Sequence, residues 1–229
     1  EVIKIRYRHE YKIYINLGDY YIIRSRTKQI MKLDKHAGEN GQYTIRSVYF
    51  DNLNDSALFE KITGVNHREK FRIRFYNGDT SYIRLEKKMK DNGLTAKIKI
   101  QITKDECLKI MNGDIDWLNQ RDENLLNELY IKMKNGLYRP KTIVDYVREA
   151  YIYPIGNVRV TFDKSIRSGL FSTDIFDKNL PTVEVLNPNK LVLEVKFDEF
   201  IPDIIADIIQ TGERSARSVS KYALCRTFG

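Results

Sequence analysis

The sequence predicts an α+β fold, a closed antiparallel β-barrel of about eight strands with helices around its outside. About eight segments alternate between apolar and polar residues, as half-buried strands do. Several of them follow one another through short turns, which is typical of antiparallel meanders. Regular alternation across so many strands favours a barrel or a strongly curved sheet.

The first quarter of the chain contains two strands and two helices. In chain order they are a strand at residues 3–15, a helix at 17–35, a strand at 43–51 and a short helix ending at residue 62. Asn16 and Asn54 stand where the N-caps of the two helices are expected. Gly64 follows the second helix, where a left-handed residue commonly ends one.

The middle of the chain forms a meander followed by helices. Strands are predicted at residues 70–76, 81–89 and 94–103. The turns between them contain Asn77-Gly78 and Asn92-Gly93, and Asn-Gly is a strong hairpin signal. Helices are predicted at residues 104–111 and 122–134.

The last third returns to strands at residues 142–154, 157–164, 182–187 and 190–197. Pro202 is placed at the opening of a helix to residue 209, and a last short helix is predicted at about residues 215–226. No domain boundary is visible, so residues 1–229 are expected to form one domain.

Composition limits the classes of protein. Lys and Arg outnumber Asp and Glu by 39 to 31, and the net charge of +8 indicates an anionic partner. Two cysteines and three histidines match no zinc-site spacing and no disulfide framework, which favours the reducing cytoplasm. No run of about 18 apolar residues is present, so no membrane-spanning segment is expected.

The charges of the strands share faces. Lys70, Arg72 and Arg74 alternate with Phe71 and Ile73, and other predicted strands repeat the pattern with Arg84, Glu86 and Lys88, with Lys97 and Lys99, with Arg148, with Arg159, and with Glu194 and Lys196. On one strand this is what any sheet with a wet face shows. Cations in register on adjacent strands repel, and we expect only a bound anion to make that repulsion tolerable. Turned inward, these faces would form a cationic tunnel suited to polyphosphate.

Three glutamates lie among these cations. Glu10, Glu86 and Glu194 are followed two residues later by Lys12, Lys88 and Lys196, so each pair shares a strand face. Such carboxylates could hold Mn²⁺ or Mg²⁺ against phosphate oxygens. The alternative is a set of cross-strand ion pairs.

An ordered set of motifs resembles a known family. The motifs are Arg8-His9-Glu10-Tyr11-Lys12, Tyr49-Phe50-Asp51-Asn52, Arg72-Ile73-Arg74-Phe75-Tyr76, Leu85-Glu86-Lys87-Lys88, Tyr146-Val147-Arg148-Glu149-Ala150-Tyr151, Val158-Arg159-Val160-Thr161-Phe162-Asp163, Leu193-Glu194-Val195-Lys196 and Ser220-Lys221-Tyr222. Together they resemble the VTC domain, the polyphosphate-polymerase domain of the vacuolar transporter chaperone family, which belongs to the triphosphate tunnel metalloenzymes.

The resemblance implies a metal-dependent phosphotransferase that extends polyphosphate from ATP inside a tunnel. The catalytic positions it implies are Lys12, Arg72, Arg74, Lys88, Lys97, Arg148, Arg159 and Lys221. Glu194 is implied as the ligand of Mn²⁺ or Mg²⁺, with Glu86 and Glu10 as further candidates. Additional phosphate contacts are expected from Arg8, Lys70, Lys196 and Ser220. Arg8 stands where hydrolytic relatives typically carry an acid, which favours polymer binding.

Other functions stay open from the sequence. One is a tripolyphosphatase or nucleoside triphosphatase of the same superfamily, and another is a non-catalytic polyphosphate-binding module. A nucleic-acid module is disfavoured because the aromatic residues are expected on the apolar faces, where bases cannot stack on them. The expected partners are ATP and polyphosphate, and a membrane partner protein is left open.

Overall fold

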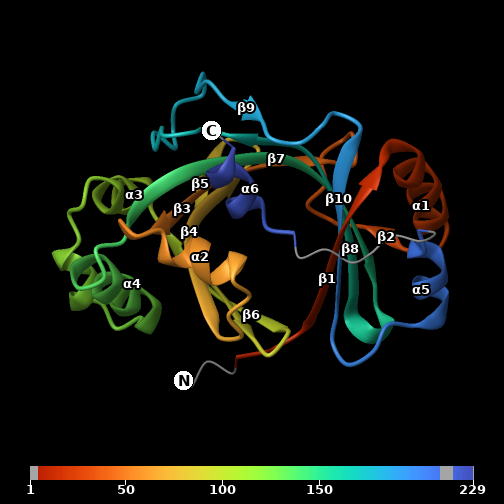
Figure 1. The fold of residues 1–229 in the computed structure, drawn as a ribbon, viewed down its shortest axis with the longest axis horizontal. Helices are drawn as coiled ribbons and strands as arrows, with labels where there is room; N and C mark the ends of the chain where they lie inside the picture. Colours follow the sequence, from red (N-terminus) through yellow and green to blue (C-terminus); the bar gives the residue numbers. More distant parts are fainter. Residues whose placement is uncertain (1–4, 212–218, 229) are drawn as a thin grey trace.

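The computed structural model describes residues 5–211 and 219–228, and its centre is an antiparallel sheet of ten strands that curls into a barrel (Figure 1). Along the main path the strands are β1 (His9–Asn16), β10 (Lys190–Phe197), β8 (Val158–Ser168), β7 (Arg139–Tyr153), β3 (Tyr43–Asp51), β4 (Arg68–Tyr76), β5 (Asp79–Asp91) and β6 (Leu94–Ile102). The short strands β2 (Lys32–Leu33) and β9 (Val183–Glu184) pair with β7 and β8. The predicted α+β barrel with outer helices is confirmed.

The barrel is brought together at the two edges of this path. Arg8, just before β1, and Thr95 on β6 form one antiparallel bridge. Each of the two residues donates its backbone N–H to the carbonyl of the other, at 2.8 Å in both directions. The closure between the first and last strands therefore rests on a short contact, whereas every other neighbouring pair on the path forms a longer ladder.

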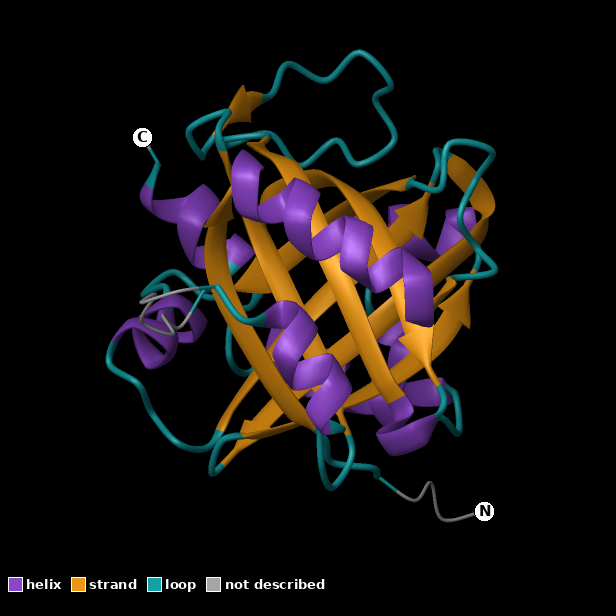
Figure 2. Ribbon diagram, turned by 90° about the vertical axis from the view of Figure 1, so that its right-hand side faces the viewer, coloured by secondary structure: helices purple, strands orange, loops and turns teal. Residues whose placement is uncertain are grey.

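Helices cover the outer face of the sheet at two places. Helices α3 (Lys104–Met111) and α4 (Asn124–Lys134), with a 3₁₀ turn at Asp116–Gln120, pack on residues such as Phe71 and Ile73. Helices α1 (Leu17–Ile30) and α5 (Asp203–Ile209) pack on residues such as Val160 and Leu193, and α1 lies across the strands in Figure 2.

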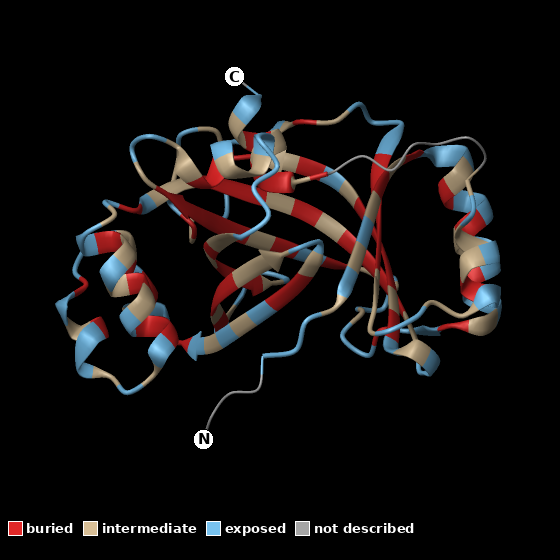
Figure 3. Ribbon diagram, turned by 60° about the horizontal axis from the view of Figure 1, so that its bottom comes forward, coloured by how far each residue is buried: buried red, intermediate tan, exposed pale blue. Residues whose placement is uncertain are grey.

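Alternation along the strands then decides what lies inside. Because successive side chains point to opposite faces, an apolar outer face leaves the charged positions of the same strands pointing inward. Figure 3 shows buried and partly exposed residues alternating along the curled strands. The barrel is apolar outside, under its helices, and its inner face combines the charged positions with an apolar cluster that includes Ile45, Val144 and Val192 and packs on α6.

One buried carboxylate joins three elements beside the interior. Asp51, at the end of β3, accepts hydrogen bonds from the backbone N–H groups of Ala57 at 2.9 Å and Leu58 at 3.1 Å, and so caps α2 (Ser56–Ile62). It also accepts from the Tyr222 hydroxyl at 2.6 Å, which fixes α6 (Lys221–Thr227). The ring of Tyr222 stacks on Tyr49 with centroids 5.1 Å apart. This junction holds the start of α6 against the barrel interior.

Several predicted boundaries are wrong. The first strand begins at His9, not at residue 3, because His9 pairs with Phe197, the last residue of β10, and the residues before it have no strand partner in β10; residues 3 and 4 lie outside the described part. The first helix ends at Ile30 rather than residue 35, because Lys32 and Leu33 pair with β7. The strand predicted at 182–187 shrinks to Val183–Glu184.

The ends of two helices also differ from expectation. The predicted Asn16 cap is confirmed, with a capping box between Asn16 and Asp19. Asn54 does not cap α2, since Asp51 and Asn52 accept the N–H groups at that helix start. The last helix begins at Lys221 with Ser220 as its N-cap, and the start predicted at residue 215 lies outside the described residues.

The two asparagines give a prediction for stability. Asn16→Ala should lower the free energy of unfolding by about 1 kcal/mol, because the N–H of Asp19 loses the side-chain acceptor that lies 2.8 Å away. Asn54→Ala is the matched control and should change it by less than about 0.5 kcal/mol. Urea unfolding of both variants measures the difference, and equal losses would show that the cap assignment is wrong.

Candidate active site

A cavity of about 760 Å³ occupies the inside of the barrel. Among the described residues that line it are fifteen lysines and arginines and four acids. The cations are Lys12, Lys61, Arg68, Lys70, Arg72, Arg74, Arg84, Lys88, Lys90, Lys97, Lys99, Arg148, Arg159, Lys196 and Lys221. Two more carboxylates, Glu86 and Asp163, are fully buried against this lining. Cations still exceed carboxylates by nine, so the cavity favours a polyanion.

Glu86 on β5 pairs with three cations. Its carboxylate accepts from Arg72 Nη2 at 2.7 Å and from Lys97 Nζ at 3.1 Å, and lies 3.8 Å from Arg74 Nε. Burial alone would raise the pKa of Glu86, but the two guanidinium groups and Lys97 hold it well below its usual range. Glu86 is therefore ionised and fixes these three cations, all of which line the cavity.

Tyrosine hydroxyls complete the support of the arginines. Arg72 donates to the Tyr49 hydroxyl at 2.9 Å, and Arg74 donates to the Tyr146 hydroxyl at 3.1 Å. Burial would raise the pKa of Tyr49, yet Arg72 and Arg74 lower it. The guanidinium planes are thus oriented before any ligand binds.

These tyrosines correct an expectation. Tyr43, Tyr49, Tyr76, Tyr82 and Tyr146 line the charged cavity, so the aromatic residues do not all lie on the apolar faces. A tyrosine can pack its ring beside a guanidinium while its hydroxyl accepts a hydrogen bond, and Tyr49 does so with Arg72, whose guanidinium carbon lies 5.7 Å from the ring centroid. The Tyr43 hydroxyl accepts a hydrogen bond from Arg159 at 2.8 Å. Arg159 also donates to Asp34 at 2.6 Å.

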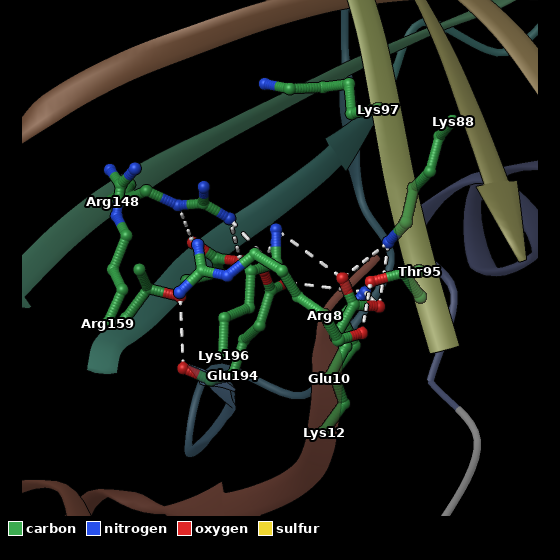
Figure 4. Close-up of polar contacts among 12 residues, drawn as sticks. Arg8, Glu10, Lys12, Lys88, Thr95, Lys97, Arg148, Arg159, Glu194 and Lys196 are labelled. Carbon is green, nitrogen blue, oxygen red and sulfur yellow. Dashed lines mark hydrogen bonds and ion pairs between the residues drawn. The ribbon is translucent and has the colours of Figure 1, made fainter. Parts of the chain in front are cut away.

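Glu10 on β1 and Glu194 on β10 form the centre of a second group (Figure 4). Lys12 Nζ lies 2.8 Å from Glu10 and 3.3 Å from Glu194, and Lys196 Nζ lies 3.4 Å and 2.9 Å from the same two carboxylates. Lys88 reaches across from β5 to Glu10 at 2.6 Å. Burial would raise the pKa of Glu194, but Lys12, Lys196 and other cations keep it well below the usual value.

Asp163 on β8 supports a third group. It accepts two hydrogen bonds from Arg148, at 2.6 and 2.8 Å, and pairs with Lys221 from α6 at 2.5 Å. Arg148 and Lys221 also lie 3.9 and 4.0 Å from Glu194. Asp163 therefore links α6 to the same centre.

The internal carboxylates correct the argument about repulsion. Cations do lie in register on adjacent strands, as Lys70 and Lys88 do. The expectation that only a bound anion could make this tolerable is wrong, because Glu10, Glu86, Asp163 and Glu194 neutralise part of the charge. The excess of cations that remains is what an external anion can bind.

The donor set fits a divalent cation held jointly with a ligand. Glu10 and Glu194 approach the same ammonium groups, so one ion between them could bind both carboxylates and phosphate oxygens, an arrangement that suits Mg²⁺ or Mn²⁺. Within the described ranges no group of three or more His, Cys, Asp or Glu could hold a metal by itself. Glu86 offers little, since it is fully buried and, unlike Glu10 and Glu194, is not among the residues that line the cavity.

The other predicted site residues are placed as follows. Lys70 and Ser220 line the cavity, and Ser220 Oγ also accepts from the N–H of Ala223. Arg8 is not among the lining residues, because its guanidinium pairs with Asp198 at 2.9 Å outside it. Sequence reasoning missed the supporting roles of Tyr49 and Tyr146. The alternation of β3 offered a signal for Tyr49, because it places Tyr49 on the same strand face as Ser47, which contacts Arg74.

Residues 7–228 match the sequence family described as the VTC domain, which confirms the resemblance seen in the motifs. No curated protein matches the chain significantly. None of the helices in the described part has the length and apolar character that crossing a membrane requires.

Two solved structures show a similar fold. One is a Bacillus halodurans protein provisionally described as an adenylate cyclase, with a TM-score of 0.51, 12% identity, and 85% of this chain and 82% of that one covered. The other is a protein from Pyrococcus horikoshii, with a TM-score of 0.50, 13% identity, and 96% and 99% covered. At these identities the likeness shows the fold alone.

The Glu86 group gives a prediction. Glu86→Gln should lower the free energy of unfolding by about 3 kcal/mol, because Arg72, Arg74 and Lys97 lose a buried counter-charge. We expect added tripolyphosphate to restore part of the loss, since an anion that binds the folded cavity more tightly than the unfolded chain stabilises the fold. Urea unfolding with and without the anion provides the measurement.

The control for this substitution is Asp116→Asn, which removes an exposed partner of Lys134 and should change stability by less than about 1 kcal/mol. If Glu86→Gln were as mild as the control, Glu86 would not be what holds the arginines.

Proposed function

This chain belongs to the VTC domain family, and from that premise we propose that it transfers the γ-phosphoryl group of ATP to a growing polyphosphate chain inside the barrel cavity. In this proposal the substrates bind in the cavity. The reaction joins two phosphate groups and releases ADP.

The observation that carries the proposal is the extent of the cationic lining. Cations follow one another along β4 at Arg68, Lys70, Arg72 and Arg74, a row of about 20 Å at roughly 3.3 Å per residue. Even when Lys70 and Lys97, whose pKa values burial lowers to about 7, are left out of the count, seven more cations than carboxylates remain, which is more than a nucleotide triphosphate alone would neutralise. A chain of phosphates matches both the length and the charge.

The side chains of the centre can support an in-line displacement. A terminal oxygen of the chain attacks the γ-phosphorus, and the bond from that phosphorus to the bridging oxygen of ADP breaks. The attacking oxygen is already ionised, so no general base is required. Arg72, Arg74 and Arg148, each fixed by a carboxylate, stabilise the charge that spreads over the transferred group.

Glu194 and Glu10 would hold a divalent cation in this centre. When bound, such an ion would neutralise negative charge on the phosphate oxygens, which the two carboxylates cannot do themselves. Lys12 and Lys196, which now lie between the two carboxylates, would then turn their ammonium groups toward phosphate.

The decisive assay is incubation of the purified chain with ATP and Mn²⁺, followed by gel analysis for long phosphate chains. Accumulation of chains together with ADP supports the polymerase. Release of free phosphate without chains would replace it with a triphosphatase, in which water takes the place of the chain oxygen. Phosphate-chain binding with neither product would leave a non-catalytic binding module.

Glu194 provides the matching substitution. Glu194→Gln should reduce ATP turnover by roughly a hundredfold or more, because it keeps the shape of the side chain and removes one of two carboxylates that can bind the metal. Binding of tripolyphosphate should persist or strengthen, since a negative charge leaves the cavity. Turnover with Mn²⁺ and calorimetric binding are measured in parallel.

Glu199→Gln is the control, because Glu199 is an exposed residue after β10 and should leave turnover unchanged. Wild-type turnover by Glu194→Gln would remove Glu194 from the metal site.

A further inference from the structure

Lys70 on β4 has a buried amine without a hydrogen-bond partner among the described residues. Its Nζ has no hydrogen-bond partner in the described structure, although the side chain lines the cavity. It lies 4.8 Å from the ring centroid of Tyr222. Lys88, directly opposite in the β4–β5 register, differs because it pairs with Glu10 at 2.6 Å. Of two facing lysines, one has a carboxylate and the other does not.

The charged groups around Lys70 come from every neighbouring element. They are Lys61 and Glu60 on α2, Arg68 on β4, Lys12 on β1, Lys88 on β5 and Asp51 on β3. Neither carboxylate hydrogen-bonds Lys70. Asp51 already accepts from two N–H groups of α2 and from the Tyr222 hydroxyl. A buried polar group without a partner calls for one, and among several cations that partner is an anion.

We propose that Lys70, with Lys61 and Arg68, forms a further anion subsite that holds a phosphate group of a chain extending beyond the Glu10–Glu194 centre, and that Lys70 takes up a proton when this phosphate binds. The inference rests on the proposed function, because it assumes a phosphate-chain ligand. Lys70 shares a strand face with Arg72, one repeat of about 6.7 Å away, so the row that would grip the central phosphates continues directly to it.

The direction of the proton movement follows from the surroundings. Burial, Lys61 and Arg68 lower the pKa of Lys70 to about 7. A bound phosphate would raise it again, because it supplies the missing opposite charge. Below about pH 6 the amine is already charged and nothing is taken up. Above pH 7 binding must recruit a proton, so affinity should fall with rising pH, by up to about tenfold per unit.

The experiment is calorimetric titration of the full chain with long-chain polyphosphate at pH 8, without metal, in two buffers of different ionisation enthalpy. The difference between buffers gives the protons taken up. Lys70→Met should bind more weakly and take up fewer protons than the wild type, by close to one. Lys97 also has its pKa lowered to about 7, through burial and the nearby arginines. The difference between variants is therefore the readout.

Two further variants separate charge from proton uptake. Lys70→Arg keeps a permanent charge, so it should retain affinity at pH 8 and lose the same fraction of proton uptake. Lys99→Met removes another cavity lysine, from β6, and should weaken binding while leaving the uptake of the wild type. If Lys70→Met does not fold, the Lys70→Arg comparison alone decides.

Ligand length tests where the subsite lies. The Lys70-dependent uptake should appear with the long chain and be absent with pyrophosphate, which is too short to span the centre and Lys70 together. Equal uptake by wild type, Lys70→Met and Lys70→Arg would overturn the subsite, as would equal Lys70 dependence with pyrophosphate. Failure of the wild type to bind any phosphate chain would instead overturn the proposed function.

Discussion

The barrel depends on partial neutralisation of cations by buried carboxylates. Arginine and lysine side chains from neighbouring strands point into one enclosed space, where like charges would repel strongly. Glu10, Glu86, Asp163 and Glu194 each pair with two or more of them, which offsets part of this repulsion. The carboxylates neutralise only part of the positive charge. Every central guanidinium is fixed in position, yet the cavity keeps a large excess of positive charge.

The fixed positions of the cations and their excess charge would each favour the binding of phosphate groups. Positions set before binding spare the reorganisation that flexible surface arginines would need. Residual charge and walls of low dielectric concentrate the field on an anion. Helices pack on the outside of the curled strands, and the Asp51 junction holds α6, which brings Lys221 to the centre.

Sequence alone predicted the strands with clear alternation, including β3 and β10 to the residue, because period-two patterns are local. It failed where a residue outside the element decides. The first helix ends at Ile30 because β7 takes up Lys32 and Leu33, and α2 is capped by Asp51, which belongs to the preceding strand. Parity placed Arg72 and Arg74 on one face, but their tyrosine partners come from β3 and β7, and no pattern within β4 reveals them.

The central claim is that the excess charge inside the barrel is the binding site of a phosphate chain. A crystal structure of the chain grown with polyphosphate tests it most directly. The account predicts phosphate groups in a row within the cavity, in contact with Arg72, Arg74 and Arg148, while Glu86 and Asp163 keep their present partners. Polyphosphate bound on the outer surface beside an interior without phosphate would contradict it.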